Sequence, residues 1–182
     1  VWSKGVAERL RDEGRKGAVV RMEKLNQLRG ERLRKAYERA VGEARNEFRA
    51  LRYDPLFVAG MTLHMARGTK EVPGQVRFRS ADPELLKLYL AFLTKTGNVP
   101  PEKVRAAVFA HPGLDTQTAV RFWALAIGVP PARFVKTMSV PGKYDAREFK
   151  YGSCVLTVSS SYLKAKMLEW AVLLPKELIG RP

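Results

Sequence analysis

The chain has 182 residues, 46% of them hydrophobic, which is enough for one domain with a sizeable core plus an appendage. Its 33 Lys and Arg residues exceed its 18 acidic residues and give a net charge of +15, which favours a polyanion such as nucleic acid as partner. A generally basic, solvated surface is the alternative interpretation. The single Cys154 excludes an intramolecular disulfide and a CxxC zinc site. With no membrane-length apolar run and no signal peptide, we expect a cytoplasmic, nucleoid-associated protein encoded by a bacterium or phage.

Residues 1–53 are predicted to form a basic helical arm in front of a domain that covers residues 54–182. Apolar residues between positions 25 and 51 recur mainly at spacings of three and four, which is the period of an amphipathic helix. Gly14 and Gly17 predict a break between a short first helix and a long second one. We expect the arm to pack against another surface and to leave its basic face free for phosphate. A solvated arm, a coiled coil and a linker lying along DNA are all compatible with the pattern.

The dipeptide Asp54-Pro55 predicts the start of a helix over residues 55–67, because Asp is a good N-cap and Pro suits the first turn. Gly68 is expected to end this helix. Its residues are almost all apolar or small, which predicts a helix that is buried on every side.

Strict alternation over residues 75–79 predicts a strand with Val76 and Phe78 on its core face and basic side chains on its other face. A second helix starts at Asp82-Pro83, and a further strand is expected over residues 104–110. Residues 115–127 are predicted to form a helix with Asp115 as its N-cap.

The last third of the chain is predicted to contain two strands, over residues 134–140 and 153–159, joined by a polar loop over residues 141–151. A final helix begins at a cap provided by Ser160 or Ser161. This order of elements predicts an α+β fold with one sheet and helices packed on it.

The segment 56–70 resembles the signature helix of the LAGLIDADG homing-endonuclease family, in a bacterial branch with a pattern like L-L-L-A-G-I-A-L-Y-W-G-E-G-T-K. Later segments are similar to further blocks of that branch, so the resemblance covers residues 54–174, about two thirds of the chain. The matching signature residues are Leu56, Ala59, Gly60, Leu63, Gly68, Thr69 and Lys70. The matching later blocks are 82–86, 92–93, 111–115, 121–123, 128–130, 134–136 and 152–154.

The resemblance implies an αββαββα domain, in which a mixed sheet with helices on one face forms a saddle over double-stranded DNA. Only one signature helix is present, so the family pattern implies a homodimer through the 55–67 helix; a monomer is the alternative. The residues implied at that interface are Ala59, Gly60, Leu63 and Ala66. Members of the branch often carry an N-terminal helix-turn-helix, and Val1-Trp2-Ser3 would be the end of an upstream one.

The signature helix lacks the acidic, metal-binding residue that nuclease activity would need. Active family members carry an acidic residue before the helix-ending glycine, where it binds a divalent metal such as Mg²⁺. This position is Arg67, or Met65 in a shorter register, and neither side chain can ligate the ion. Glu71 is a weak replacement, with a solvent-exposed charge as the simpler interpretation. We therefore expect no cofactor, unless the chain is an active endonuclease that uses Mg²⁺.

The resemblance implies that the outer strand face binds DNA, since arginine reads guanine edges and both arginine and lysine contact phosphates. Any one of these side chains is equally compatible with an ordinary solvated charge. The expected DNA-binding residues are Arg67, Lys70, Arg77, Arg79, Lys136, Lys143, Arg147 and Lys150.

Three functional hypotheses follow. The first is a DNA-binding regulator or accessory factor without nuclease activity. The second is an active homing-type endonuclease. The third is an interaction module that docks on a larger DNA or RNA-polymerase machine.

Overall fold

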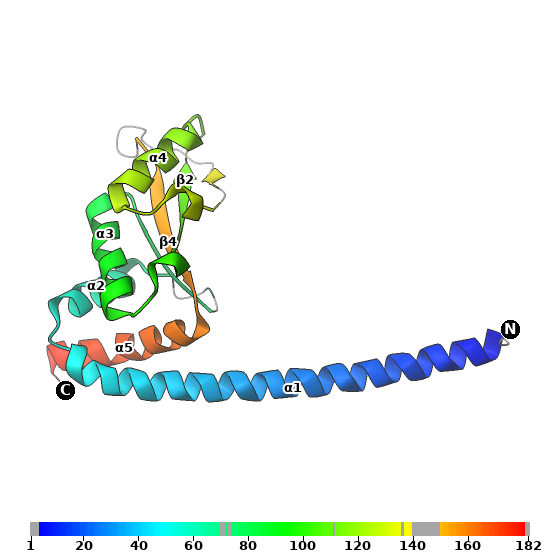
Figure 1. The fold of residues 1–182 in the computed structure, drawn as a ribbon. Coiled ribbons are helices and arrows are strands. Elements are labelled where there is room, and N and C mark those ends of the chain that lie inside the picture. Colours follow the sequence, from blue (N-terminus) through cyan, green and yellow to red (C-terminus); the bar gives the residue numbers. More distant parts are fainter. Residues whose placement is uncertain are drawn as a thin grey trace. The chain divides into compact units, whose positions relative to one another are not determined.

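The structure is a computed structural model that describes residues 4–69, 72, 74–110, 112–135, 137–139 and 150–180. These residues form an α+β fold, which confirms the predicted class (Figure 1). The helices are α1 (Lys4–Leu51), α2 (Pro55–Arg67), α3 (Pro83–Ala91), α4 (Thr116–Ile127) and α5 (Ser161–Ile179). The strands are β1 (Gln75–Ser80), β2 (Arg105–Ala110), β3 (Met138–Ser139) and β4 (Ser153–Ser159). Within the described ranges one strand follows α2 and one follows α3, so the order differs from the expected αββαββα pattern.

The chain divides into two compact units, Val1–Arg39 and Ala40–Pro182, so the boundary lies earlier than the expected one after residue 53. Helix α1 runs without interruption from Lys4 to Leu51, and the predicted break at Gly14 and Gly17 is wrong. Each glycine costs about 1 kcal/mol relative to alanine in a helix, and the surrounding Arg, Glu, Lys, Leu and Ala residues are among the best helix formers.

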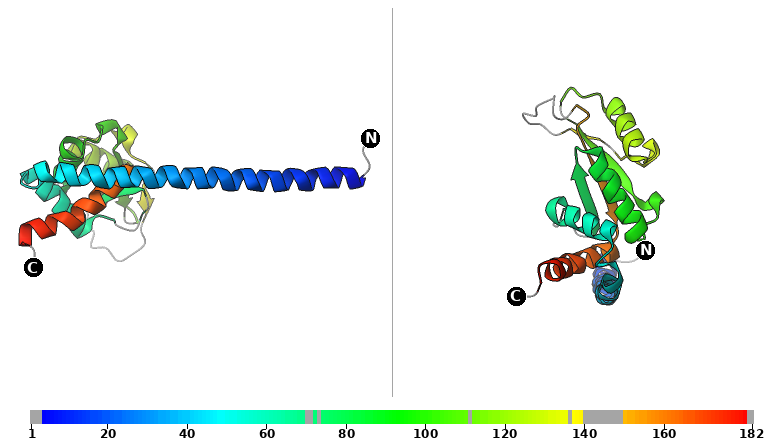
Figure 2. Two further views of the ribbon diagram at one scale, coloured as in Figure 1. Left: turned by 90° about the horizontal axis from the view of Figure 1, so that it is seen from below. Right: turned by 90° about the vertical axis from the view of Figure 1, so that its left-hand side faces the viewer.

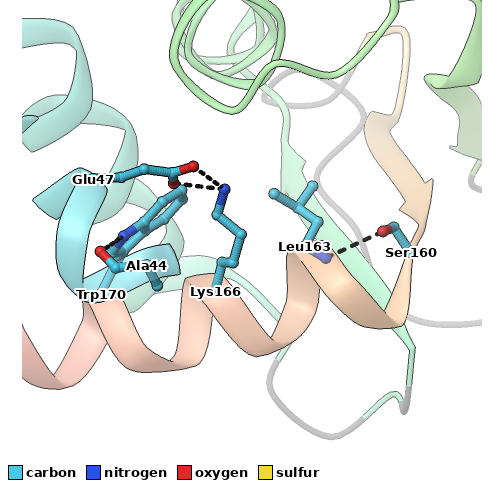
Figure 3. Close-up of polar contacts among 6 residues, drawn as sticks. All are labelled: Ala44, Glu47, Ser160, Leu163, Lys166 and Trp170. Carbon is cyan, nitrogen blue, oxygen red and sulfur yellow. Dashed lines mark hydrogen bonds and ion pairs between the residues drawn. The ribbon is translucent and has the colours of Figure 1, made fainter. Parts of the chain in front are cut away.

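The last turns of α1 belong to the second unit because they pack on α5, beside which they lie in both views of Figure 2. Ala40 and Ala44 are fully buried, and small side chains allow two helices to approach closely. The indole Nε1 of Trp170 donates a hydrogen bond to the carbonyl of Ala44 at 2.9 Å. Lys166 Nζ lies 2.6 Å from Oε1 of Glu47 (Figure 3). These contacts fix residues 40–51 to the domain.

The sheet is mixed and has the strand order β1-β4-β2-β3. β4 is antiparallel to both neighbours, whereas the two-residue β3 is parallel to β2. One face of the sheet is buried under the helices and joins the core around Phe57, Tyr89 and Trp123. Its residues are Val76, Phe78, Ala106, Val108, Cys154, Leu156 and Val158. Burial raises the pKa of the Cys154 thiol to about 12, which leaves it protonated and unreactive at neutral pH.

Helix α2 begins and ends at the predicted residues. The side chain of Asp54 accepts a hydrogen bond from the amide of Phe57 at 2.6 Å, and Pro55 occupies the first turn. Gly68 follows the last residue in an extended conformation rather than a left-handed one. The expectation of burial on every side is wrong within this chain, because Thr62 and Ala66 are exposed.

Helices α4 and α5 begin at the N-cap residues that the sequence predicts. The carboxyl group of Asp115 accepts hydrogen bonds from the hydroxyl of Thr118 and from the amides of Thr118 and Gln117, and these bonds lower its pKa. Ser160 caps α5 by accepting from the amide of Leu163 at 3.1 Å, as Figure 3 shows. Of the strand predicted over residues 134–140, Met138–Ser139 and a bridge at Phe134 pair with β2, and residues 136 and 140 lie outside the described residues. Within the described residues, no helix is long and apolar enough to cross a membrane.

Candidate functional site

The outer face of the sheet, opposite the core face, carries the predicted basic residues of β1. In this strand Val76, Phe78 and Ser80 are buried, and Arg77 and Arg79 alternate with them. The pairing register extends the outer face across the neighbouring strands. We define it as Gln75, Arg77, Arg79, Arg105, Ala107, Phe109, Ser153, Val155, Thr157 and Ser159. These positions include three arginines and no carboxylate.

Arg77 and Arg105 flank the central strand. Both are in register with Thr157 of β4, one from each side. Neighbouring strands lie roughly 4.8 Å apart, so the two arginines start roughly 10 Å from each other across the sheet. Arg105 is exposed, Arg77 is half-buried, and neither makes an ion pair in the described part of the chain. Arg105 is therefore open to an anion, whereas the Nε of Arg77 is buried and has no hydrogen-bond partner among the described residues.

Arg79 is held flat on the same face by two contacts. Its Nε donates a hydrogen bond to Ser153 Oγ at 2.9 Å, and its guanidinium carbon lies 4.5 Å from the centre of the Phe109 ring. Guanidinium groups stack on aromatic faces and keep their charge in proteins. Among the described residues the terminal N–H donors of Arg79 make no hydrogen bond, so they can serve a ligand. This arrangement orients the side chain before any ligand binds.

Arg67 and Arg79 meet at the edge of the outer face. Together with Ser80, Ala81 and Ser153 they line an open pocket of about 380 Å³. Arg67 is the last residue of α2, where the negative end of the helix dipole favours a cation. The pocket therefore combines two guanidinium groups with two hydroxyl groups, a set that suits a phosphate or another oxyanion.

The chain that leaves α2 is joined to β1 and α5, and this fixes the position of Arg67. Gly68 forms a bridge with Phe78, and the amide of Thr69 donates to the carbonyl of Arg77 at 3.2 Å. Lys164 Nζ donates to the carbonyl of Thr69 at 2.7 Å. Lys164 is almost fully buried, and the loss of solvation lowers its pKa. Lys164 is a positioning residue that no sequence pattern revealed.

The pocket does not fit a divalent metal ion. Mg²⁺ is bound in proteins through carboxylate oxygens, and none of the lining residues carries one. Among the residues that the structure describes, no cluster of three His, Cys, Asp or Glu side chains could hold a metal ion. Glu71, the weak replacement, lies outside the described residues.

The structure brings together three of the predicted DNA-binding residues, Arg67, Arg77 and Arg79. Lys150 lies elsewhere: its Nζ is 5.4 Å from the centre of the Tyr151 ring, which stacks on Phe122 of α4. Four others lie outside the described residues, namely Lys70, Lys136, Lys143 and Arg147. Sequence reasoning missed Arg105, although the alternation within the strand predicted over residues 104–110 could have identified it.

Three of the residues expected at a dimer interface, Ala59, Leu63 and Ala66, lie within roughly 60° of one another around the axis of α2. Ala66 is exposed, and Ala59 and Leu63 are half-buried. Gly60, in contrast, is buried against Phe92 of the same chain, and a Cβ atom at this position would overlap the ring. The small size of Gly60 therefore serves packing within the chain. His64 is also internal, with Nδ1 2.9 Å from the hydroxyl of Tyr89.

Comparison of the chain with models of protein families, with curated proteins and with solved structures gives no match. Its function is therefore inferred from the geometry and charge of the outer face and of its pocket.

Proposed function

We propose that this chain binds duplex DNA through the outer face of its sheet, as a regulator or accessory factor, and that it does not cut the DNA. The observation that carries the proposal is the set of three arginines on a face without carboxylates. Arginine forms paired hydrogen bonds to phosphate and to guanine, so one such face can both position and read a duplex.

The pocket at the edge of this face supports binding without cleavage. A phosphate seated between Arg67 and Arg79 would accept hydrogen bonds from both guanidinium groups. Cleavage by a metal-dependent nuclease needs a cation beside the scissile phosphate, and two guanidinium groups repel a cation. The resemblance of residues 54–174 to LAGLIDADG domains agrees with DNA as the ligand.

The proposal is tested by removing the charge of the outer face. We expect the triple variant R77Q/R79Q/R105Q to bind duplex DNA more weakly. The slope of log K against log salt should fall by about 1 for each arginine that no longer neutralises a phosphate. The matched control is K87Q/K95Q/K103Q, which removes the same charge from three exposed lysines that are not outer-face positions; Lys87 is paired with Glu84 at 2.7 Å. Fluorescence anisotropy over a salt series measures both variants.

Two outcomes would contradict the proposal. Equal weakening by the two triples would mean that only the net charge matters, and DNA cleavage by the parent protein with Mg²⁺ or Mn²⁺ would show an active nuclease. The single variant R105Q replaces an exposed side chain, so it repeats the test with little risk to the fold if the triple variant is unstable.

A further inference from the structure

A row of arginines follows one side of the helical arm, which belongs to the unit Val1–Arg39. Arg21, Arg32 and Arg39 are separated by 11 and 7 residues, and at 3.6 residues per turn these spacings place them within roughly 20° around the helix axis. We call these three residues the arginine row. Lys24 and Lys35 flank it, and all five side chains are exposed.

The arginine row is not neutralised by the acids of the arm. Glu23, Glu31 and Glu38 lie roughly 80° or more away from it around the helix. Glu43 follows Arg39 by four residues on nearly the same side, but the two form no ion pair within the described residues. The described part of the arm contains one ion pair, between Arg34 and Glu38 at 4.0 Å, and both residues are outside the row. The row therefore presents three free guanidinium groups along one line.

The exposed apolar residues of the arm do not form a competing surface. Val19, Met22, Leu25 and Leu28 are about half exposed, and they follow one another at intervals of three residues. Val20 and Leu33 are also exposed and lie roughly 140° apart around the axis. Each step of three turns by roughly 300°, so the apolar side chains wind around the helix instead of sharing a face. An amphipathic helix on a membrane, or a coiled coil, needs one continuous apolar stripe.

We propose that the arginine row is a second DNA-binding surface, which contacts the phosphate backbone of a duplex. At a rise of about 1.5 Å per residue, the row is roughly 27 Å long, which is most of a helical turn of DNA. Its spacing suits repeated phosphate contacts, which give affinity without reading sequence. This inference rests on the proposed function, because it assigns to the arm the same ligand as to the outer face of the sheet.

The test compares two triple variants of the full chain with equal reduction of charge. R21Q/R32Q/R39Q removes the arginine row, and R15Q/R29Q/R34Q removes three exposed arginines from other sides of the same helix. Glutamine forms helices about as well as arginine, so the arm should stay helical, and circular dichroism checks this. On a duplex of unrelated sequence, we expect the row variant to lower the salt slope by about 2 to 3, and the control to lower it by less than about 1.

Equal effects of the two triples, or no effect of the row variant, would overturn the inference. Failure of the proposed function looks different, since R77Q/R79Q/R105Q would then bind like the parent while the row variant still binds more weakly. A parent chain that binds no duplex would contradict both. If the variant R21Q/R32Q/R39Q is less helical than the parent, the single variants R21Q, R32Q and R39Q repeat the test. Each should lower the slope of log K against log salt by about 0.9.

Discussion

Arg67 shows how one side chain can decide between two chemistries. A carboxylate at the end of α2 would attract a divalent cation, whereas the guanidinium binds an oxyanion and repels the cation. In the same pocket Arg79 carries a second guanidinium group, and Ser153 adds a hydroxyl group whose oxygen accepts a hydrogen bond from Nε of Arg79. The charge of these groups suits an oxyanion better than a cation, which supports the proposal of DNA binding without cleavage.

The fit of Gly60 against Phe92 leads to a prediction about stability. We expect Gly60→Ala to destabilise the domain by about 1–3 kcal/mol, because the new methyl group overlaps a buried ring. Gly42→Ala is the matched control: it lies in α1 with no atom within 4 Å of the added Cβ, and it should stabilise by roughly 0.5–1 kcal/mol. Urea unfolding measures both, and a stabilising Gly60→Ala would contradict the packing.

Helices with a capping residue and strands with alternating residues were predictable from the sequence. Asp54, Asp115 and Ser160 each satisfy amide groups in the first turn of a helix, and β1 and β4 follow their alternating residues. The outer face was predictable within β1 for the same reason. The position of Arg105 beside Thr157 was not, because the order β1-β4-β2 is set by contacts between distant segments.

Local sequence patterns also could not predict the residue at which the arm ends and the domain begins. Spacings of mainly three and four residues run from Leu25 past Ala40 to Leu51, so periodicity alone cannot show where the contact with the partner helix begins. The buried contacts of Ala44 and Glu47 with α5 establish this boundary, and they join residues about 120 positions apart.

The contact between α1 and α5 leads to a prediction about stability. We expect Ala44→Leu to cost about 1–3 kcal/mol, because a larger side chain at this fully buried position forces the two helices apart. Ala18→Leu is the same change at an exposed position of the same helix, and it should alter stability by less than about 0.5 kcal/mol. Thermal unfolding followed by circular dichroism compares them. Equal effects would mean that residues 40–51 do not belong to the domain.

At the scale of the whole molecule, one face of α2 is left without a cover. A helix composed almost wholly of apolar and small residues is normally buried on all sides, yet Thr62 and Ala66 are exposed in the single chain. The small side chains of this face would let a second helix approach closely. A two-fold dimer would carry two copies of the outer face and of its arginines.

We therefore predict that the protein is a homodimer through this face of α2 and that Ala66→Glu makes it monomeric. A charged side chain buried between two apolar helices loses its hydration without gaining a partner, and this cost favours dissociation. Ala132→Glu, an identical change at another exposed alanine, should leave the dimer intact. Sedimentation velocity over a concentration series distinguishes the two states. A monomeric parent, or a dimer that persists in Ala66→Glu, would show that α2 does not form the contact, and the outer face would then bind DNA as a single copy.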